Sequence, residues 1–291
     1  MAVYVKSVPQ EQMSTDALFR EFGKFISDSL ESLGWALQAD SGDIDWATVT
    51  RETTTAWIVK GYEIRKSGTG GGTAVYMKIQ YGSGYVANAL GITVQMGTGF
   101  DGAGTLTGVL NTAMRIGGAS GNASGIGYFT VSGDDERWAI HQGETPTPAN
   151  NSVGFFQRTC DSDGTDNGTG FLLGCFGYTT TTIATNQYSS FADGAGTQDA
   201  TFSWMYWPRL PAAGGAIPYF PVFMQALTNS GYVMVRDMLY CPYVFAPLHS
   251  IHVVNHFGAN RTYRSVVGNT TAASQFGYTP ATTMAVLMRI D

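Results

Sequence analysis

The fold is decided by a stretch that begins Ala56-Trp-Ile-Val-Lys-Gly-Tyr-Glu-Ile-Arg65 and resumes, after a glycine-rich turn, as Ala74-Val-Tyr-Met-Lys-Ile-Gln-Tyr81. Apolar and polar residues alternate in both segments, which is the period of a strand with one buried face. Further strand-like runs follow at residues 91–97, 127–132, 137–142, 154–159, 170–178, 202–207, 219–226, 232–240, 251–256 and 285–290. Turn residues separate nearly all of them. The sequence therefore predicts an all-β fold with an antiparallel β-sandwich or jelly-roll-like body.

One segment near the start breaks the β pattern and predicts an amphipathic helix over residues 15–33. Ser14 or Thr15 suits the N-cap, and Gly34 suits the left-handed residue after the helix. The broad apolar face of this helix consists of Leu18, Phe19, Phe22, Phe25, Ile26, Leu30 and Leu33. Such a face must pack on the rest of the domain or on a neighbouring subunit, and we expect subunit docking.

Two segments follow from these patterns. Residues 1–40 are expected to form an N-terminal arm and docking helix, in which Val3, Tyr4 and Val5 suit an edge strand that Pro9 stops. Residues 41–291 are expected to form a β-sandwich-like structural domain.

The composition excludes several classes of function. Charged residues make up 13% of the 291 residues, about half the share typical of soluble domains, and the net charge is −6. No basic stripe is present, so nucleic acid is not an expected partner. No apolar run is long enough for a membrane span, no secretory signal is recognisable, and we expect reduced cysteines. A surface this poor in charge indicates that other subunits cover much of it.

Two clusters have residue types that bind metals, but neither has the spacing of a known site. His252 and His256 share one side of a predicted strand and His249 lies opposite, with no glutamate where a metalloprotease needs its base. Asp161, Asp163 and Asp166 lie in a loop that lacks the later ligands of a calcium-binding EF-hand. Packed histidines and turn aspartates are the favoured interpretation, and no metal or cofactor is expected.

Enzyme motifs are absent from the sequence. Asp134, Asp135 and Glu136 form an acidic run, but adjacent residues on a strand point to opposite faces, which is a poor arrangement for a glycosidase pair. No nucleophile elbow and no phosphate-binding loop occurs. We expect no enzymatic activity, and a polysaccharide depolymerase remains a runner-up hypothesis.

An aromatic stretch at residues 202–223 offers a second kind of site. Its candidates for contact with a sugar or with another subunit are Trp204, Tyr206, Trp207, Tyr219 and Phe220. Exposed tryptophan and tyrosine stack on sugar rings, but the same residues fill cores and interfaces. Core and interface roles are favoured here, and glycan contact stays open.

The order of motifs in the first third resembles a known family. The helix Asp16-Ala-Leu-Phe-Arg-Glu-Phe-Gly-Lys-Phe-Ile-Ser-Asp-Ser-Leu-Glu-Ser-Leu-Gly-Trp35 leads into Gly42-Asp-Ile-Asp-Trp-Ala-Thr-Val-Thr50. Next come Tyr62-Glu-Ile64, Met77-Lys-Ile-Gln-Tyr-Gly-Ser-Gly84 and Gly91-Ile-Thr-Val-Gln-Met-Gly-Thr-Gly-Phe-Asp-Gly-Ala-Gly-Thr-Leu-Thr-Gly108. This order is similar to virion structural proteins of tailed bacteriophages, of the tail, baseplate or tail-fibre type. The resemblance covers about residues 15–110.

The resemblance implies a non-enzymatic virion structural protein in the baseplate, collar or fibre-attachment region of the tail. It implies assembly in the host bacterial cytoplasm with other phage virion proteins, as a homo-oligomer of three- or six-fold symmetry. A lectin-like tail-fibre module that recognises a host surface glycan is one alternative, and a capsid decoration protein is another.

Overall fold

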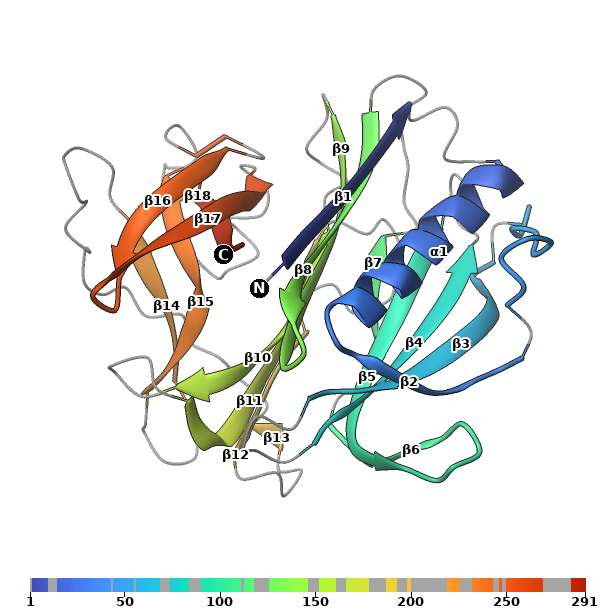
Figure 1. Cartoon of the computed structure of the whole chain (residues 1–291), viewed down its shortest axis with the longest axis horizontal. Coiled ribbons are helices and arrows are strands. Elements are labelled where there is room, and N and C mark those ends of the chain that lie inside the picture. Colours follow the sequence, from blue (N-terminus) through green and yellow to red (C-terminus); the bar gives the residue numbers. More distant parts are fainter. Residues whose placement is uncertain are drawn as a thin grey trace.

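A computed structural model describes eighteen strands and one helix (Figure 1). The elements are β1 (Ala2–Pro9), α1 (Asp16–Ser32), β2 (Ala36–Asp40), β3 (Ile58–Lys66), β4 (Tyr76–Ser83), β5 (Gly91–Phe100), β6 (Leu106–Val109), β7 (Met114–Gly117), β8 (Ile126–Asp134), β9 (Arg137–Thr145), β10 (Ser152–Cys160), β11 (Asp166–Gly177), β12 (Gln187–Ala192), β13 (Gln198–Asp199), β14 (Phe220–Gln225), β15 (Tyr232–Pro242), β16 (Ile251–His256), β17 (Ala259–Gly268) and β18 (Met284–Arg289). The described residues are 2–9, 15–42, 44–54, 56–68, 74–83, 90–110, 113–117, 126–145, 152–160, 166–177, 187–192, 198–199, 219–225, 232–242, 246–247, 250–268 and 284–291.

Every strand pairing among these residues is antiparallel. The prediction of a mostly β, antiparallel fold with one N-terminal helix is therefore confirmed. The predicted hairpin is β3 and β4, and β16 has the predicted bounds of residues 251–256. β17 was not predicted, and the predicted strand at residues 202–207 lies outside the described residues.

The strands form two hydrogen-bonded sheets. The smaller one has the order β2-β3-β4-β5-β6, with β7 beside β5, and curls around α1 (Figure 1). The larger one has the order β1-β8-β9-β10-β15-β18-β17-β16, with β11, β12, β13 and β14 on side branches. One edge of β10 pairs with β9 over residues 152–156 and with β15 at residues 159–160. The larger sheet therefore divides into two arms at β10.

The helix begins and ends where its sequence favours it. The side chain of Thr15 accepts a hydrogen bond from the Leu18 backbone N–H at 3.3 Å, which caps the N-terminus. Gly34 has φ +96°, a conformation that costs little only for glycine, and it ends the helix. Both predicted boundary roles are confirmed, with Thr15 rather than Ser14 as the N-cap.

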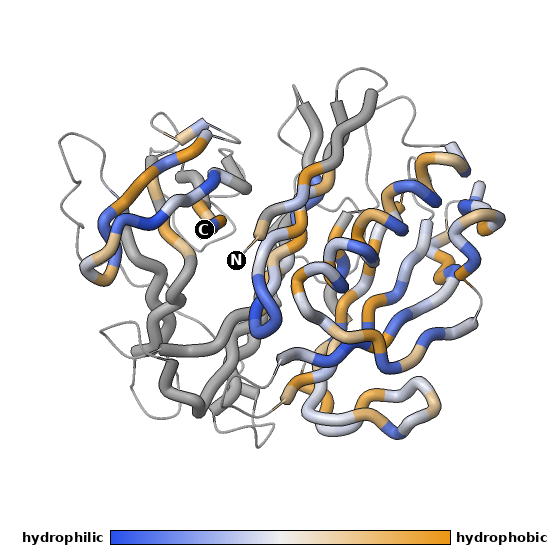
Figure 2. The backbone as a smooth tube through the Cα atoms, viewed as in Figure 1, coloured by the Kyte–Doolittle hydropathy of each residue, from blue (hydrophilic) through white to orange (hydrophobic). Residues whose placement is uncertain are grey.

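The apolar face of α1 packs between the two sheets (Figure 1). Phe22 contacts Phe129 of β8 with ring centroids 4.7 Å apart, and Trp35 meets Phe156 of β10 edge to face at 6.0 Å. On its other side the helix shares the core with Met77 and its neighbours on β4 and β5. Figure 2 shows apolar segments of the helix lying against apolar segments of the neighbouring strands.

This packing corrects the expected role of the helix. Six of the predicted docking residues, Leu18, Phe19, Phe22, Ile26, Leu30 and Leu33, are buried in the chain's own core, and Phe25 packs against that core partly buried. A sequence period reveals that a face is apolar but not which surface covers it. The helix therefore packs within its own domain, and its core includes side chains on both sides of the predicted boundary at residue 40.

Gly23 has a packing role inside the helix. A Cβ atom at this position would lie 2.1 Å from the ring of Trp46, so only glycine leaves room for the indole. Trp46 in turn meets Tyr81 of β4 edge to face, with centroids 5.0 Å apart. The glycine thus lets the segment after β2 pack closely over the helix.

A buried polar cluster, formed by Ser27, Glu63, Arg65 and Tyr81, joins the helix to the smaller sheet. Arg65 donates hydrogen bonds to Glu63 at 2.8 Å, to the Trp35 carbonyl at 2.9 Å and to the Ser27 hydroxyl at 2.9 Å. Glu63 also accepts from Ser27 at 2.6 Å and from the Tyr81 hydroxyl at 3.2 Å. The Arg65 side chain is only 1% exposed, so each of these bonds replaces water that burial removes.

We predict that Arg65→Ala lowers the free energy of unfolding by about 3–5 kcal/mol, because the change leaves the Glu63 carboxylate buried without its cation. Urea unfolding of the purified chain measures the loss. Lys24→Ala is the matched control, since Lys24 forms an exposed ion pair with Asp28 at 2.7 Å. That control is expected to cost about 0.5 kcal/mol or less. Equal losses in the two variants would contradict the structural role of the cluster.

Candidate functional site

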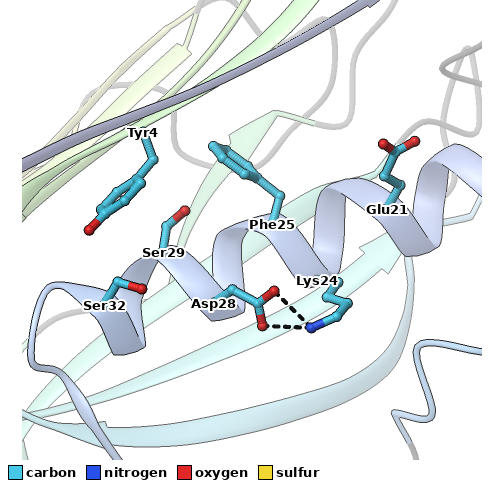
Figure 3. A pocket seen from close by; sticks show the side chains of 7 residues that line it. All are labelled: Tyr4, Glu21, Lys24, Phe25, Asp28, Ser29 and Ser32. Carbon is cyan, nitrogen blue, oxygen red and sulfur yellow. Dashed lines mark hydrogen bonds and ion pairs between the residues drawn. The ribbon is translucent and has the colours of Figure 1, made fainter.

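A groove runs between the arm strand β1 and the outer side of α1 (Figure 3). Its volume is about 300 Å³, and its lining residues are Tyr4, Glu21, Lys24, Phe25, Asp28, Ser29 and Ser32. Tyr4 projects from β1 and Phe25 from the helix, so that each wall contributes one aromatic ring (Figure 3). Lys24 holds the Asp28 carboxylate with two hydrogen bonds of 2.8 and 2.7 Å along the exposed side of the helix.

The groove combines aromatic rings with hydroxyl and carboxylate groups. Aromatic rings stack on apolar faces of ligands, while hydroxyl and carboxylate groups form hydrogen bonds around them. The helical period explains why the groove was not predicted. Phe25 was assigned to the docking face, and nothing in the sequence places Tyr4 beside it.

His252 lies at the centre of a hydrogen-bonded chain in the second core of the molecule, which is formed by Tyr219, Leu239, Cys241, Ala246, Val254, Tyr263 and Leu287. Its Nδ1 atom lies 2.9 Å from the Tyr219 hydroxyl, and its Nε2 atom lies 2.7 Å from the Ser250 hydroxyl. A serine, a histidine and a third group in this order also occur in nucleophilic catalysis. The proton positions decide between catalysis and structure.

The Ser250 hydroxyl donates its proton to the Pro247 carbonyl at 2.6 Å. It therefore accepts from Nε2–H of His252, and Nδ1 accepts from Tyr219. An imidazole with its proton on the nitrogen facing the serine has no lone pair there to receive the serine proton. Burial lowers the pKa of His252, which favours this neutral form. The arrangement suits a structural histidine, and both ring nitrogens are occupied by protein partners.

His256 lies on the same buried side of β16 as His252, as the alternation along the strand predicted. Its Nδ1 atom lies 2.5 Å from the Tyr263 hydroxyl, and its ring stacks on Phe257 with centroids 4.1 Å apart. Nearby, burial raises the pKa of the Cys241 thiol to about 12, which keeps it protonated and unreactive at neutral pH. These groups pack the second core.

The acidic run at residues 134–136 forms the tip of the β8–β9 hairpin. Asp134 accepts a hydrogen bond from Arg137 at 2.7 Å, and its carbonyl accepts one from the Trp35 indole at 2.9 Å. The Asp135 carbonyl accepts from the Gly68 N–H at 2.6 Å. The tip thus joins the larger sheet to the end of the helix and to the smaller sheet, which is a structural task.

The remaining predicted site residues are placed as follows. Tyr219 is only 6% exposed, so its ring is a core side chain rather than a platform for sugar. Phe220 begins β14 and Asp166 begins β11, and their side chains are not described. Asp161, Asp163, Trp204, Tyr206 and Trp207 lie outside the described residues.

The described residues hold no group of three or more histidine, cysteine, aspartate or glutamate side chains arranged to bind a metal ion. No helix in the described part of the chain has the length and apolar character to cross a membrane. Comparisons with protein-family models, with curated protein sequences and with solved structures give no match.

We predict that the stability of the protein falls as the pH drops below about 6.5, the ordinary pKa of histidine. Burial lowers the pKa of His252 in the folded state, so the unfolded chain binds more protons in this range. The stabilising contribution is therefore complete above the unfolded pKa and is lost as the pH falls through the folded one. Urea unfolding between pH 5 and about 8 measures the slope.

His252→Gln provides the control for this slope. Glutamine keeps a donor and an acceptor but does not titrate, so the variant is expected to show a shallower pH dependence, whatever its stability at neutral pH. An unchanged slope in this variant would show that other groups cause the pH dependence.

Proposed function

We propose that this chain is a non-enzymatic structural protein of a bacteriophage virion. Its place is the tail, in the baseplate, collar or fibre-attachment region, where it assembles as a symmetric oligomer with other virion proteins. Apolar side chains along the sheet edges carry this proposal. Seven large hydrophobic side chains are exposed in the described part of the chain, namely Val5, Leu37, Ile58, Val59, Val109, Ile251 and Val253.

These side chains share one kind of location. Val5, Leu37, Val109 and the β16 pair lie on strands at the ends of the two sheets, β1, β2, β6 and β16. β2 pairs with β3 only at residues 63–66. Ile58 and Val59 lie on the earlier part of β3, which β2 does not pair with. Apolar side chains exposed at sheet edges favour contact with another chain. The location supports a subunit that is covered by neighbours.

The polar centres of the described chain support a structural role. The Arg65 cluster joins the helix to a sheet, the hairpin tip at Asp134 joins the two sheets, and the His252 chain holds the second core. Arg65, Asp134 and His252 each form hydrogen bonds with other side chains or with the backbone. The order of motifs over residues 15–110 resembles that of tail proteins, and this resemblance supports a place in the virion.

The test is to find the chain in the particle. We expect antibodies against the chain to label the tails of purified virions in electron micrographs, with several copies per particle by quantitative mass spectrometry. Particles grown with an amber mutation in the corresponding gene should lack the label and the tail part. Absence of the chain from purified particles would contradict the proposal, and labelling on the head would favour the capsid decoration alternative.

The groove beside α1 favours a receptor-binding module as the second candidate. Its rings, Tyr4 and Phe25, lie beside hydroxyl and carboxylate groups, a combination that suits a host surface glycan. A glycan array with the purified chain tests this function. Binding that is lost in Tyr4→Ala would establish it, whereas an array with no bound sugar, or binding that this variant leaves unchanged, would count against the groove.

A further inference from the structure

β16 is an edge strand with three side chains exposed to solvent, two of which are aliphatic. It is the last strand of the larger sheet and pairs only with β17 in the described part of the chain (Figure 1). Its side chains alternate strictly, with His252, Val254 and His256 buried and the other three exposed. Ile251 is 55% exposed and Val253 is 62% exposed.

The pairing of β16 with β17 determines which backbone N–H and C=O groups of β16 point away from β17. The Ser265 N–H donates to the Ser250 carbonyl at 3.0 Å, and position 251 lies opposite position 264. In an antiparallel ladder, hydrogen-bonded and non-hydrogen-bonded positions alternate. The even positions therefore bond to β17, and the backbone groups of Ile251, Val253 and Asn255 point to the free edge. The same three residues carry the exposed side chains.

Each of the other edge strands has a feature that hinders regular pairing with a second strand. β1 contains Lys6 and ends at Pro9, β2 has an irregular register between Leu37 and Ala39, and β6 is only four residues long. β16, Ile-His-Val-Val-Asn-His, contains no lysine, acidic residue or proline, and its register with β17 is unbroken over six residues. It is therefore an unprotected edge.

The hairpin also holds this edge in an extended form before any partner binds. Phe257 and Gly258 make a two-residue turn with φ angles of 53° and 74°. Positive values at both turn positions match the twist of the strands in such hairpins. The Phe257 ring stacks on His256 with an interplanar angle of 19°, which fixes the turn to the strand. Little conformational entropy remains to be lost when the edge pairs.

We propose that β16 pairs antiparallel with β16 of a second copy of this chain, with Val253 on the two-fold axis. This register places Ile251 opposite Asn255 of the other copy and continues the sheet through about six backbone hydrogen bonds. The exposed aliphatic side chains of the two copies then lie side by side on one face.

The partner is a second copy because the edge is complementary to itself. A strand without charges meets its own image without repulsion, even though the chain as a whole has a net charge of −6. The backbone groups that point to the free edge belong to Val253 and to the residues two positions before and after it. The two-fold register therefore pairs all three positions with the other copy. The inference rests on the proposed role as an assembling subunit and names its contact.

The test uses Val253→Lys, which places two positive charges directly opposite each other across the two-fold axis. Sedimentation equilibrium of the wild-type chain should show a reversible dimer, and the variant should raise the dissociation constant by about tenfold or more. Val109→Lys is the matched control, because Val109 is an edge-strand valine that is 45% exposed on the other sheet. The control should leave the dissociation constant of this contact unchanged.

Hydrogen exchange of the wild-type chain provides a second readout that needs no variant. The backbone amides of residues 251, 253 and 255 should exchange more slowly as the concentration rises through the dissociation constant, while the exposed amides of β2 should not change. A chain that stays monomeric, or a dimer that Val253→Lys leaves intact, would overturn the inference. Neither result would alter whether antibodies find the chain on tails, so this failure is distinguishable from failure of the virion assignment.

Discussion

The buried guanidinium group of Arg65 imposes the constraint on which the rest of the structure depends. A cation without access to water must find several acceptors in fixed directions, and here they come from three segments, namely Ser27 on α1, the Trp35 carbonyl after it and Glu63 on the same strand. The rigid fork of this group donates through Nε, Nη1 and Nη2, and it ties the position of the helix to that of β3. The apolar face of the helix accounts for most of its burial, and the Arg65 cluster fixes the orientation of the helix.

The position of the helix then determines how the two sheets meet. Trp35 lies three residues after the end of the helix at Ser32. Its carbonyl accepts from Arg65, and its indole N–H donates to the Asp134 carbonyl on the hairpin of the larger sheet. The next residue of that hairpin, Asp135, accepts from Gly68, close to the end of β3. A single residue therefore connects the helix end to both sheets, and a shift of the helix would break contacts in each.

The sequence predicts those parts of the structure that depend on local pattern. Period-two alternation identifies β3, β4 and β16, and it places His252 and His256 on one side of a strand. It does not reveal that Arg65 is buried, because a charged residue in a strand is ordinarily exposed and its partner Ser27 lies 38 positions away. For the same reason the groove between β1 and α1 was not predicted, since it depends on how distant elements pack. β17 was missed because Asn260, Arg261 and Arg264 interrupt its apolar pattern.

The low charge of the chain accounts for the apolar side chains at its sheet edges. Only 16 residues are lysine or arginine, and at least six of these form ion pairs within the chain, at positions 24, 51, 60, 65, 137 and 289. In a chain with so few charges, few remain for the strand edges, where lysine normally blocks pairing. The edges consequently carry valine, leucine and isoleucine. A fold built in this way keeps these side chains in contact with water until neighbouring chains cover them, which favours assembly over a free monomer.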